Sequence, residues 1–139
     1  MKNDTVIKPC VTLRNILTGM TQPQRGKLIK SFLKQYSKQD FYCPAVGNVR
    51  VTASGIEETA HHASKRVAST IAALNLIPII KSAKSIFSAW PPKSNYRQSK
   101  MKFVELYELH VAMDGIGTAK LMIGKNSKGF FVHYCCTAM

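Results

Sequence analysis

Acidic residues are scarce in this sequence. Its 139 residues include seven Asp and Glu against 20 Lys and Arg, so the formal net charge is +13. This excess is far larger than solubility requires, and such a surface repels itself and attracts polyanions. Asp4 and Asp40 are the only acids before Ile56, while bases are spread along the chain. The distribution favours a surface that follows a phosphate backbone, and RNA is the partner that we expect.

The sequence also lacks metal-binding motifs and long apolar runs. Its four cysteines include no C-x-x-C pair and no histidine at ligand spacing, so we expect free thiols, no metal and no cofactor. The longest apolar stretch, residues 71–80, is interrupted by an asparagine and a proline, and the N-terminus has no apolar signal region. We therefore expect no membrane insertion and a cytoplasmic location, in the chain's own cell or in a target cell.

Apolar residues recur at helical spacing in the first two thirds of the chain and at strand spacing in the last third. Thr21 followed by Gln22 and Pro23 is typical of a helix start, and Ser54 with Glu57 has the spacing of a capping box. We expect helices over 21–36, 56–76 and 79–87, and strands over 49–52, 103–113, 116–123 and 130–136.

This order of elements predicts an α+β fold. N-terminal helices should pack on one face of a small twisted antiparallel sheet, built from a C-terminal three-stranded meander and one earlier strand. The other face of the sheet should stay open for a ligand. We expect a single domain over residues 1–139, with a basic helical lead-in at 1–44 and the α+β core at 45–136.

Histidines beside cations are the pattern most suggestive of chemistry. An imidazole can move protons near neutral pH, and a cation can stabilise a phosphorane, so together they can cleave RNA through its own 2′-hydroxyl without a metal. His61, His62, Lys65 and Arg66 fall within six residues, and helical spacing pairs His62 with Arg66. The alternative is that these histidines face solvent or cap a helix end.

A second cluster depends on the register of the meander. If Asp114-Gly115 is a two-residue turn and residues 125–128 form the next turn, Lys120 lies opposite His133 and Tyr107 shares their face. A one-residue error in the second turn moves His133 to the other face. The alternative is that a lysine and a histidine simply lie on a solvated sheet face.

The same register places His110 and Glu108 on the opposite face, among Val104, Leu106 and Leu121, where we expect a structural histidine. Several aromatic residues lie between the bases in this part of the chain. Most should belong to the core, and some could stack on unpaired nucleobases.

Residues 49–65 (VRVTASGIEETAHHASK) and 72–83 (AALNLIPIIKSA) carry a family resemblance. They resemble the phage and mobile-element branch of the barnase/EndoU/colicin/RelE-like ribonuclease superfamily, including domains of large polyvalent proteins. The likeness covers about residues 45 to 136 and implies a helix bearing a histidine, a Leu-rich helix over the active sheet and a final meander. The helix histidine of the family falls on His62, and the polar residue of its last strand falls on His133. Ala63 departs from the glycine of many relatives, so the sharp turn of the family is not implied here.

Two functions remain open at this point. The first is a metal-independent endoribonuclease, toxin-like or encoded by a phage or mobile element, in which His62 and His133 act as acid and base, Lys120 and Arg66 stabilise the phosphorane, and Tyr107 orients the substrate. A cognate immunity or antitoxin protein would accompany such a toxin. The second is a non-catalytic basic module, such as a phage-encoded inhibitor or accessory factor, that binds nucleic acid or an acidic host protein. The residues expected to bind nucleic acid in either case are Lys27, Lys30, Lys34, Arg50, His61, Lys65, Arg97 and Lys100.

Overall fold

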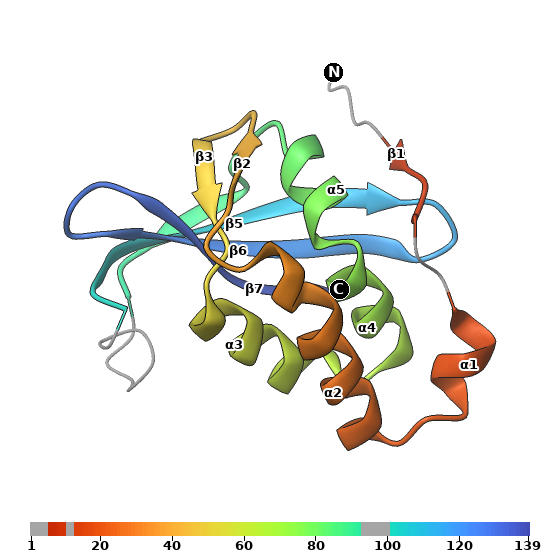
Figure 1. Cartoon of the computed structure of the whole chain (residues 1–139). Coiled ribbons are helices and arrows are strands. Elements are labelled where there is room, and N and C mark those ends of the chain that lie inside the picture. The colour runs from red at the N-terminus through yellow and green to blue at the C-terminus, as the bar shows by residue number, and fades with distance from the viewer. Residues whose placement is uncertain (1–5, 11–12, 93–100) are drawn as a thin grey trace.

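A computed structural model describes residues 6–10, 13–92 and 101–139 of the chain (Figure 1). The helices are α1 (Arg14–Thr18), α2 (Gln22–Leu33), α3 (Ala53–Ala63), α4 (Val67–Leu74) and α5 (Leu76–Ser82), and a 3-10 turn at Lys34–Tyr36 extends α2. The strands are β1 (Val6–Ile7), β2 (Asp40–Cys43), β3 (Gly47–Arg50), β4 (Ser88–Trp90), β5 (Phe103–Met113), β6 (Gly117–Asn126) and β7 (Phe131–Ala138).

The strands form one seven-stranded sheet with the order β1-β5-β6-β7-β3-β2, and β4 pairs with the same edge of β5 as β1. The predicted α+β class and the C-terminal meander are confirmed. The sheet is larger than expected and mixed, because β1 runs parallel to β5 and β3 runs parallel to β7. The additional strands β1, β2 and β4 have only two to four residues, too few for an alternating pattern to identify them.

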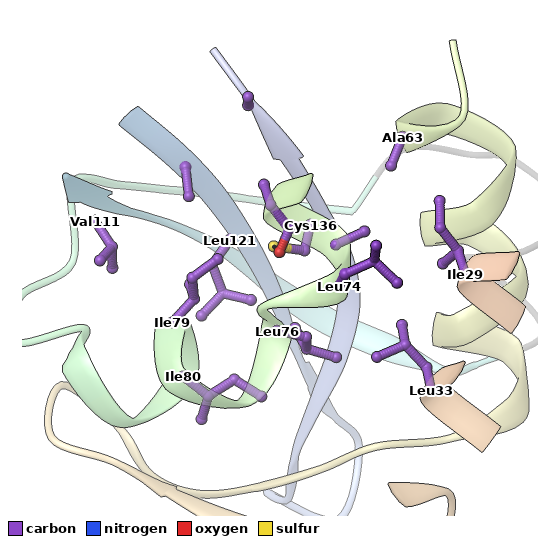
Figure 2. Close-up of a cluster of buried hydrophobic side chains, with 14 of the residues drawn as sticks. Ile29, Leu33, Ala63, Leu74, Leu76, Ile79, Ile80, Val111, Leu121 and Cys136 are labelled. Carbon is purple, nitrogen blue, oxygen red and sulfur yellow. Dashed lines mark hydrogen bonds between the residues drawn. The ribbon is translucent and has the colours of Figure 1, made fainter. Parts of the chain in front are cut away.

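The helices cover one face of the sheet (Figure 1). Helices α3 and α4 pack on β7, and α2 forms an outer layer against α3 and α4. Figure 2 shows part of the main core, to which α2 contributes Ile29 and Leu33, α5 contributes Leu76 and Ile79, and β6 contributes Leu121. Residues from the predicted basic lead-in thus belong to the same hydrophobic core as residues of the C-terminal strands.

Local capping explains where α2 and α3 begin. The Thr21 side chain accepts a hydrogen bond from the backbone N–H of Gln24, whose side chain accepts one from Thr21 N–H, so the predicted start of α2 is confirmed. The expected start of α3 at Ser54 is wrong by two residues, because Thr52 Oγ1 caps Gly55 N–H at 3.2 Å and the helix begins at Ala53.

The continuous helix expected over 56–76 is divided between α3 and α4. Arg66 has extended backbone angles (φ −138°, ψ 149°) and is the N-cap position of α4. The Thr70 hydroxyl can bond to the carbonyl oxygens of both Ala63 and Arg66, at 2.9 Å each, and it holds the two helices at the break. Pro78 lies in the first turn of α5, where its missing N–H leaves no intrahelical bond unmade.

The register of the meander differs from the prediction by one residue. Residues 114–116 form a three-residue connection, with positive φ at Gly115 (74°) and at Gly117 (109°), and Met113 pairs with Gly117. Lys120 therefore lies opposite His110, not opposite Leu109. A bulge at Tyr134 then pairs His133 with Ile123, while Lys120 pairs with Thr137.

The sheet face opposite the helices, called the open face below, has an apolar half and a polar half. The apolar half is a second hydrophobic cluster that includes Trp90, Phe103, Leu106, Val132 and Tyr134 and contains no helical residue. Strand alternation places the polar half nearer the β5–β6 turn. Its polar members are Glu108, His110, Thr118, Lys120 and Thr137.

Candidate active site and cationic groove

His133 is completely buried between β7 and α3. Its Nε2 lies 2.8 Å from the hydroxyl oxygen of Thr59, and Nδ1 has no partner among the described residues. Burial lowers the pKa of this imidazole from 6.5 to about 3, so the ring is neutral at physiological pH. A Cβ at Gly55 would overlap the carbonyl oxygen of His133, which shows how closely α3 approaches β7. His133 therefore has no access to a substrate, and its predicted position beside Lys120 is wrong.

Tyr107 lies on the helix face of β5, so the predicted shared face with Lys120 is also wrong. Its hydroxyl donates a hydrogen bond to the Glu105 carboxylate, and its ring packs against Phe131 with centroids 5.9 Å apart. The bond to Glu105, with burial as a smaller cause, raises the pKa of Tyr107 to about 12. The sheet itself separates this phenol from the Lys120 side chain.

Arg66 supports the end of β7. Its Nη2 donates hydrogen bonds to the Ala138 carbonyl oxygen and, at 3.1 Å, to Ser69 Oγ. The helical pairing of His62 with Arg66 is wrong, because α3 has ended before Arg66 is reached. The guanidinium thus satisfies a backbone carbonyl of β7 that would otherwise need a hydrogen bond from another strand. Arg66 therefore has a structural role.

His62 lies on the exposed side of α3, with Nε2 2.9 Å from Glu58 Oε2. Burial raises the pKa of the nearby Cys135 thiol to about 12, the charge of Glu58 adds to this rise, and Lys120 opposes it. A catalytic role for His62 stays a prediction.

The corrected register assembles a different polar cluster on the open face, made of Glu108, His110 and Lys120. Glu108 and His110 are two residues apart on β5, so they point to the same side of the sheet, and Glu108 Oε2 bonds to His110 Nε2. Lys120 is the direct cross-strand partner of His110, a position that brings Cβ atoms to about 4.5–5.5 Å. We call these three residues the open-face triad.

The hydrogen bond to Glu108 selects one tautomer of the neutral His110 ring. An ionised carboxylate only accepts hydrogen bonds, so Glu108 keeps a proton on Nε2 and leaves the Nδ1 lone pair of the neutral ring as a base. The exposed Phe87 ring stacks on the imidazole, with centroids 4.0 Å apart and planes at 23°, and fixes its plane. Among the residues that the structure describes, no carboxylate forms an ion pair with Lys120, so its ammonium group can bind an external anion.

Sequence reasoning missed this cluster although its signal was present. The spacing of Glu108 and His110 already places both side chains on one face of a strand. Their interpretation as structural residues followed from the two-residue turn, which moved Lys120 to the wrong side. A three-residue connection at 114–116, with glycines at its positive-φ positions, gives the observed pairing.

A groove of about 520 Å³ lies between α2 and α3 and brings together three of the residues predicted to bind nucleic acid. Lys27 and Lys30 line one wall and His61 lines the other. Glu57 also lines the groove, and its carboxylate lies 3.8 Å from Lys30 Nζ. This ion pair is neutral, so Lys27 gives the groove its net positive charge. The groove, called the cationic groove below, is open and suits a phosphate chain better than a small apolar ligand.

The other predicted binding residues are dispersed. Lys34 follows Lys30 by one turn and is exposed, and Lys65 is exposed in the connection between α3 and α4. Arg50 lies elsewhere, paired with Asp40 on β2 through Nε at 2.8 Å and Nη2 at 3.2 Å. Arg97 and Lys100 lie outside the described residues.

All four cysteines are free thiols, as predicted, and Cys135 and Cys136 belong to the two different hydrophobic clusters on opposite faces of the sheet. Among residues 6–10, 13–92 and 101–139, no group of three or more His, Cys, Asp or Glu side chains could hold a metal ion. No helix in those same segments has the length and hydropathy needed to span a membrane. Comparison of the chain with protein-family models, with curated proteins and with solved structures gives no match.

Proposed function

We propose that this protein is a metal-independent endoribonuclease whose chemistry takes place at the open-face triad. The observation that carries the proposal is the His110 imidazole, held by Glu108 on one side and facing Lys120 across the strand pair. Attack of a 2′-hydroxyl on the adjacent phosphate needs a base, a carboxylate that orients this base, and a cation. The open-face triad supplies all three. The resemblance of residues 45–136 to a ribonuclease superfamily supports the same function.

The proposed step transfers two protons and exchanges one P–O bond for another. His110 Nδ1 takes the proton of the 2′-hydroxyl while that oxygen forms a bond to phosphorus. Lys120 stabilises the charge on the phosphorane oxygens and gives a proton to the 5′-oxygen as its bond to phosphorus breaks. The products are a 2′,3′-cyclic phosphate and a free 5′-hydroxyl, and Lys120 recovers its proton through solvent from the His110 ring.

The test is incubation of the purified protein with total RNA in EDTA, followed by analysis of the new chain ends. We expect fragments that carry 2′,3′-cyclic phosphate and 5′-hydroxyl termini, because the triad needs no metal. A His110→Ala/Lys120→Ala double variant, which removes two side chains of the open face and none of the main hydrophobic core, should leave the RNA intact. RNA that stays intact with the wild-type protein, or is cut equally by the double variant, would contradict the proposal.

The cationic groove favours a second candidate function, which is nucleic-acid binding without turnover by a basic module such as a phage-encoded inhibitor or accessory factor. The groove lies on the helical side of the molecule, away from the open face, so it can bind RNA independently of the triad. The same surface could meet an acidic host protein. Tight, salt-dependent RNA binding together with an absence of cleavage would select this candidate.

Either function predicts a salt dependence controlled by exposed lysines along α2, with Lys27 in the cationic groove and Lys34 just beyond it. Lys27→Ala and Lys34→Ala should each weaken RNA binding and reduce the slope of log affinity against log salt by about 1, because each removes one phosphate contact. Lys81→Ala is the matched control, since this exposed helical lysine belongs to α5, outside the groove. Fluorescence anisotropy with a labelled RNA over a salt series gives the slopes. Equal slopes for all three variants would place the phosphate contacts elsewhere.

A further inference from the structure

A second cavity lies where the ends of β2 and β3 meet the β6–β7 turn. It has a volume of about 440 Å³ and is more enclosed than the cationic groove. Asn48 and Arg50 come from β3, and Asn126, Lys128 and Phe130 come from the end of β6 and the following turn. Pairing of β3 with β7 brings these two parts of the chain together. We refer to this cavity as the turn pocket.

The turn pocket displays an aromatic ring that its own backbone holds in place. Phe130 is 65% exposed, so its ring is accessible at the edge of the pocket. Asn126 Oδ1 accepts hydrogen bonds from the backbone N–H groups of Lys128 and Phe130, each at 3.0 Å, and Asn126 N–H donates to the Phe130 carbonyl at 2.9 Å. The ring is therefore presented by an ordered turn, and its position needs little ordering when a ligand stacks on it.

The polar groups of the pocket match a nucleotide better than a simple anion. Because the Asn126 oxygen is used by the turn, its NH₂ group remains as a donor, and the exposed Asn48 amide offers both a donor and an acceptor. Two amides beside a stacking ring are suited to the edge and the face of one nucleobase.

The charged side chains that line the turn pocket have a net charge of about one positive unit. Asp40 also lines the pocket, and the guanidinium of Arg50 beside it holds the pKa of that carboxyl below its usual value, so Asp40 stays ionised and paired. Lys128 then contributes the remaining cation. One surplus charge is appropriate for the single phosphate that accompanies one base.

The pocket is connected to the open face through Val132, whose side chain lines the pocket and belongs to the apolar cluster of that face. From Val132 to Thr137, the cross-strand partner of Lys120, β7 advances by at most roughly 16 Å at about 3.3 Å per residue. A single-stranded RNA of a few nucleotides can therefore occupy both places at once.

We infer that the turn pocket binds an unpaired nucleobase with its phosphate and anchors single-stranded RNA relative to the open-face triad. The inference takes its RNA substrate from the proposed function but does not depend on cleavage. The ligand that we propose is single-stranded RNA, because a base that is stacked and paired in a duplex cannot enter the pocket.

The experiment uses nucleoside 5′-monophosphates as probes, since they contain no bond that the proposed ribonuclease would cut. Amide NMR spectra of the ¹⁵N-labelled full chain are recorded during titration with each of the four monophosphates and with ribose 5-phosphate. We expect shifts of the Asn48 and Asn126 side-chain amides and of the Phe130 backbone amide with at least one nucleotide, and much smaller shifts with ribose 5-phosphate. Equal shifts with ribose 5-phosphate, or no shift at these groups with any nucleotide, would overturn the inference.

A matched pair of variants separates stacking from general apolar contact. Phe130→Leu should weaken nucleotide binding by roughly 5- to 150-fold, the range that loss of one base–aromatic stack produces, whereas Phe130→Tyr should bind about as well as the wild type. The exposed ring can be changed without disturbing the core, so both variants should fold. Binding that Phe130→Leu retains in full would overturn the stacking role, whatever the outcome of the cleavage assay.

Discussion

Lowering the pH from 7 to 4.5 is expected to reduce the free energy of unfolding by about 2.5 kcal/mol through His133 alone. Burial lowers the pKa of this imidazole to about 3 in the folded protein, whereas it returns to 6.5 when the chain unfolds. Between these two values the unfolded chain binds the proton and the folded protein does not, so protonation stabilises the unfolded state. The contribution of the neutral ring is fully present above pH 6.5 and is lost as the pH falls towards 3.

The measurement is urea unfolding at a series of pH values for the wild type and for His133→Gln, a neutral variant whose amide can still bond to Thr59. The wild type should lose more stability than the variant, with a difference in slope of up to about 1.4 kcal/mol per pH unit below pH 6.5. His62→Gln serves as the control, because it replaces an exposed histidine and leaves the buried imidazole of His133 in place. Parallel curves for the wild type and His133→Gln would show that the ring is not buried as described. If the variant fails to fold, NMR titration of the wild-type His133 ring gives the same answer.

Replacing His110 by Ala is expected to slow RNA cleavage by about 10²- to 10⁴-fold, the usual contribution of a positioned general base. The imidazole is the proposed acceptor of the 2′-hydroxyl proton, and its Nδ1 is left as the basic nitrogen by the bond from Nε2 to Glu108. Lys120→Ala should cost about 10²- to 10³-fold, because it removes one charged donor from the phosphorane. RNA affinity should change much less than the rate, since the cationic groove is untouched.

Single-turnover cleavage of a labelled oligoribonucleotide at saturating enzyme measures these rates. His62→Ala is the informative comparison, since it removes the imidazole that the helix pattern indicates and leaves the open-face triad intact. We expect its rate to stay close to that of the wild type. A large loss in His62→Ala with full activity in His110→Ala would move the chemistry from the open face to α3.

Much of the architecture could be predicted because its signals are local. The Thr21 cap and its Gln24 partner lie three residues apart, and both side chains are bonded as the spacing indicates. The long alternating runs that become β5, β6 and β7 leave little choice but a meander. Short strands escape such reasoning, since β1 and β4 exist through their pairing with β5 and have no pattern of their own.

The site was harder to predict because it depends on register. Counting Asp114-Gly115 as a two-residue turn shifts β6 by one position, and a shift of one residue moves Lys120 through the sheet to the other face. The bulge at Tyr134 adds a second shift on β7 that no turn residue indicates. Because of these two register shifts, the sequence predicted His133 as the neighbour of Lys120, whereas the neighbour in the structure is His110.

The binding surfaces show the same division between local and long-range information. Lys27 and Lys30 are close in sequence on α2, and their common face could be predicted from helical spacing. The position of His61 across the groove depends on how α2 packs on α3, where Gly26 approaches Ser64 closely. The turn pocket joins β3 to the β6–β7 turn, and Arg50 is its one residue that was predicted individually to bind nucleic acid.

We propose that this chain cleaves RNA by attack of the 2′-hydroxyl at the open face. The most direct measurement compares two labelled oligonucleotides in EDTA, one all-ribose and one identical except for 2′-deoxy sugars at the mapped cleavage positions. We predict that the all-ribose strand is cut to a 2′,3′-cyclic phosphate, that the substituted strand stays intact at those positions, and that both bind equally well. Cleavage of both strands at the same rate, or of neither, would contradict the claim.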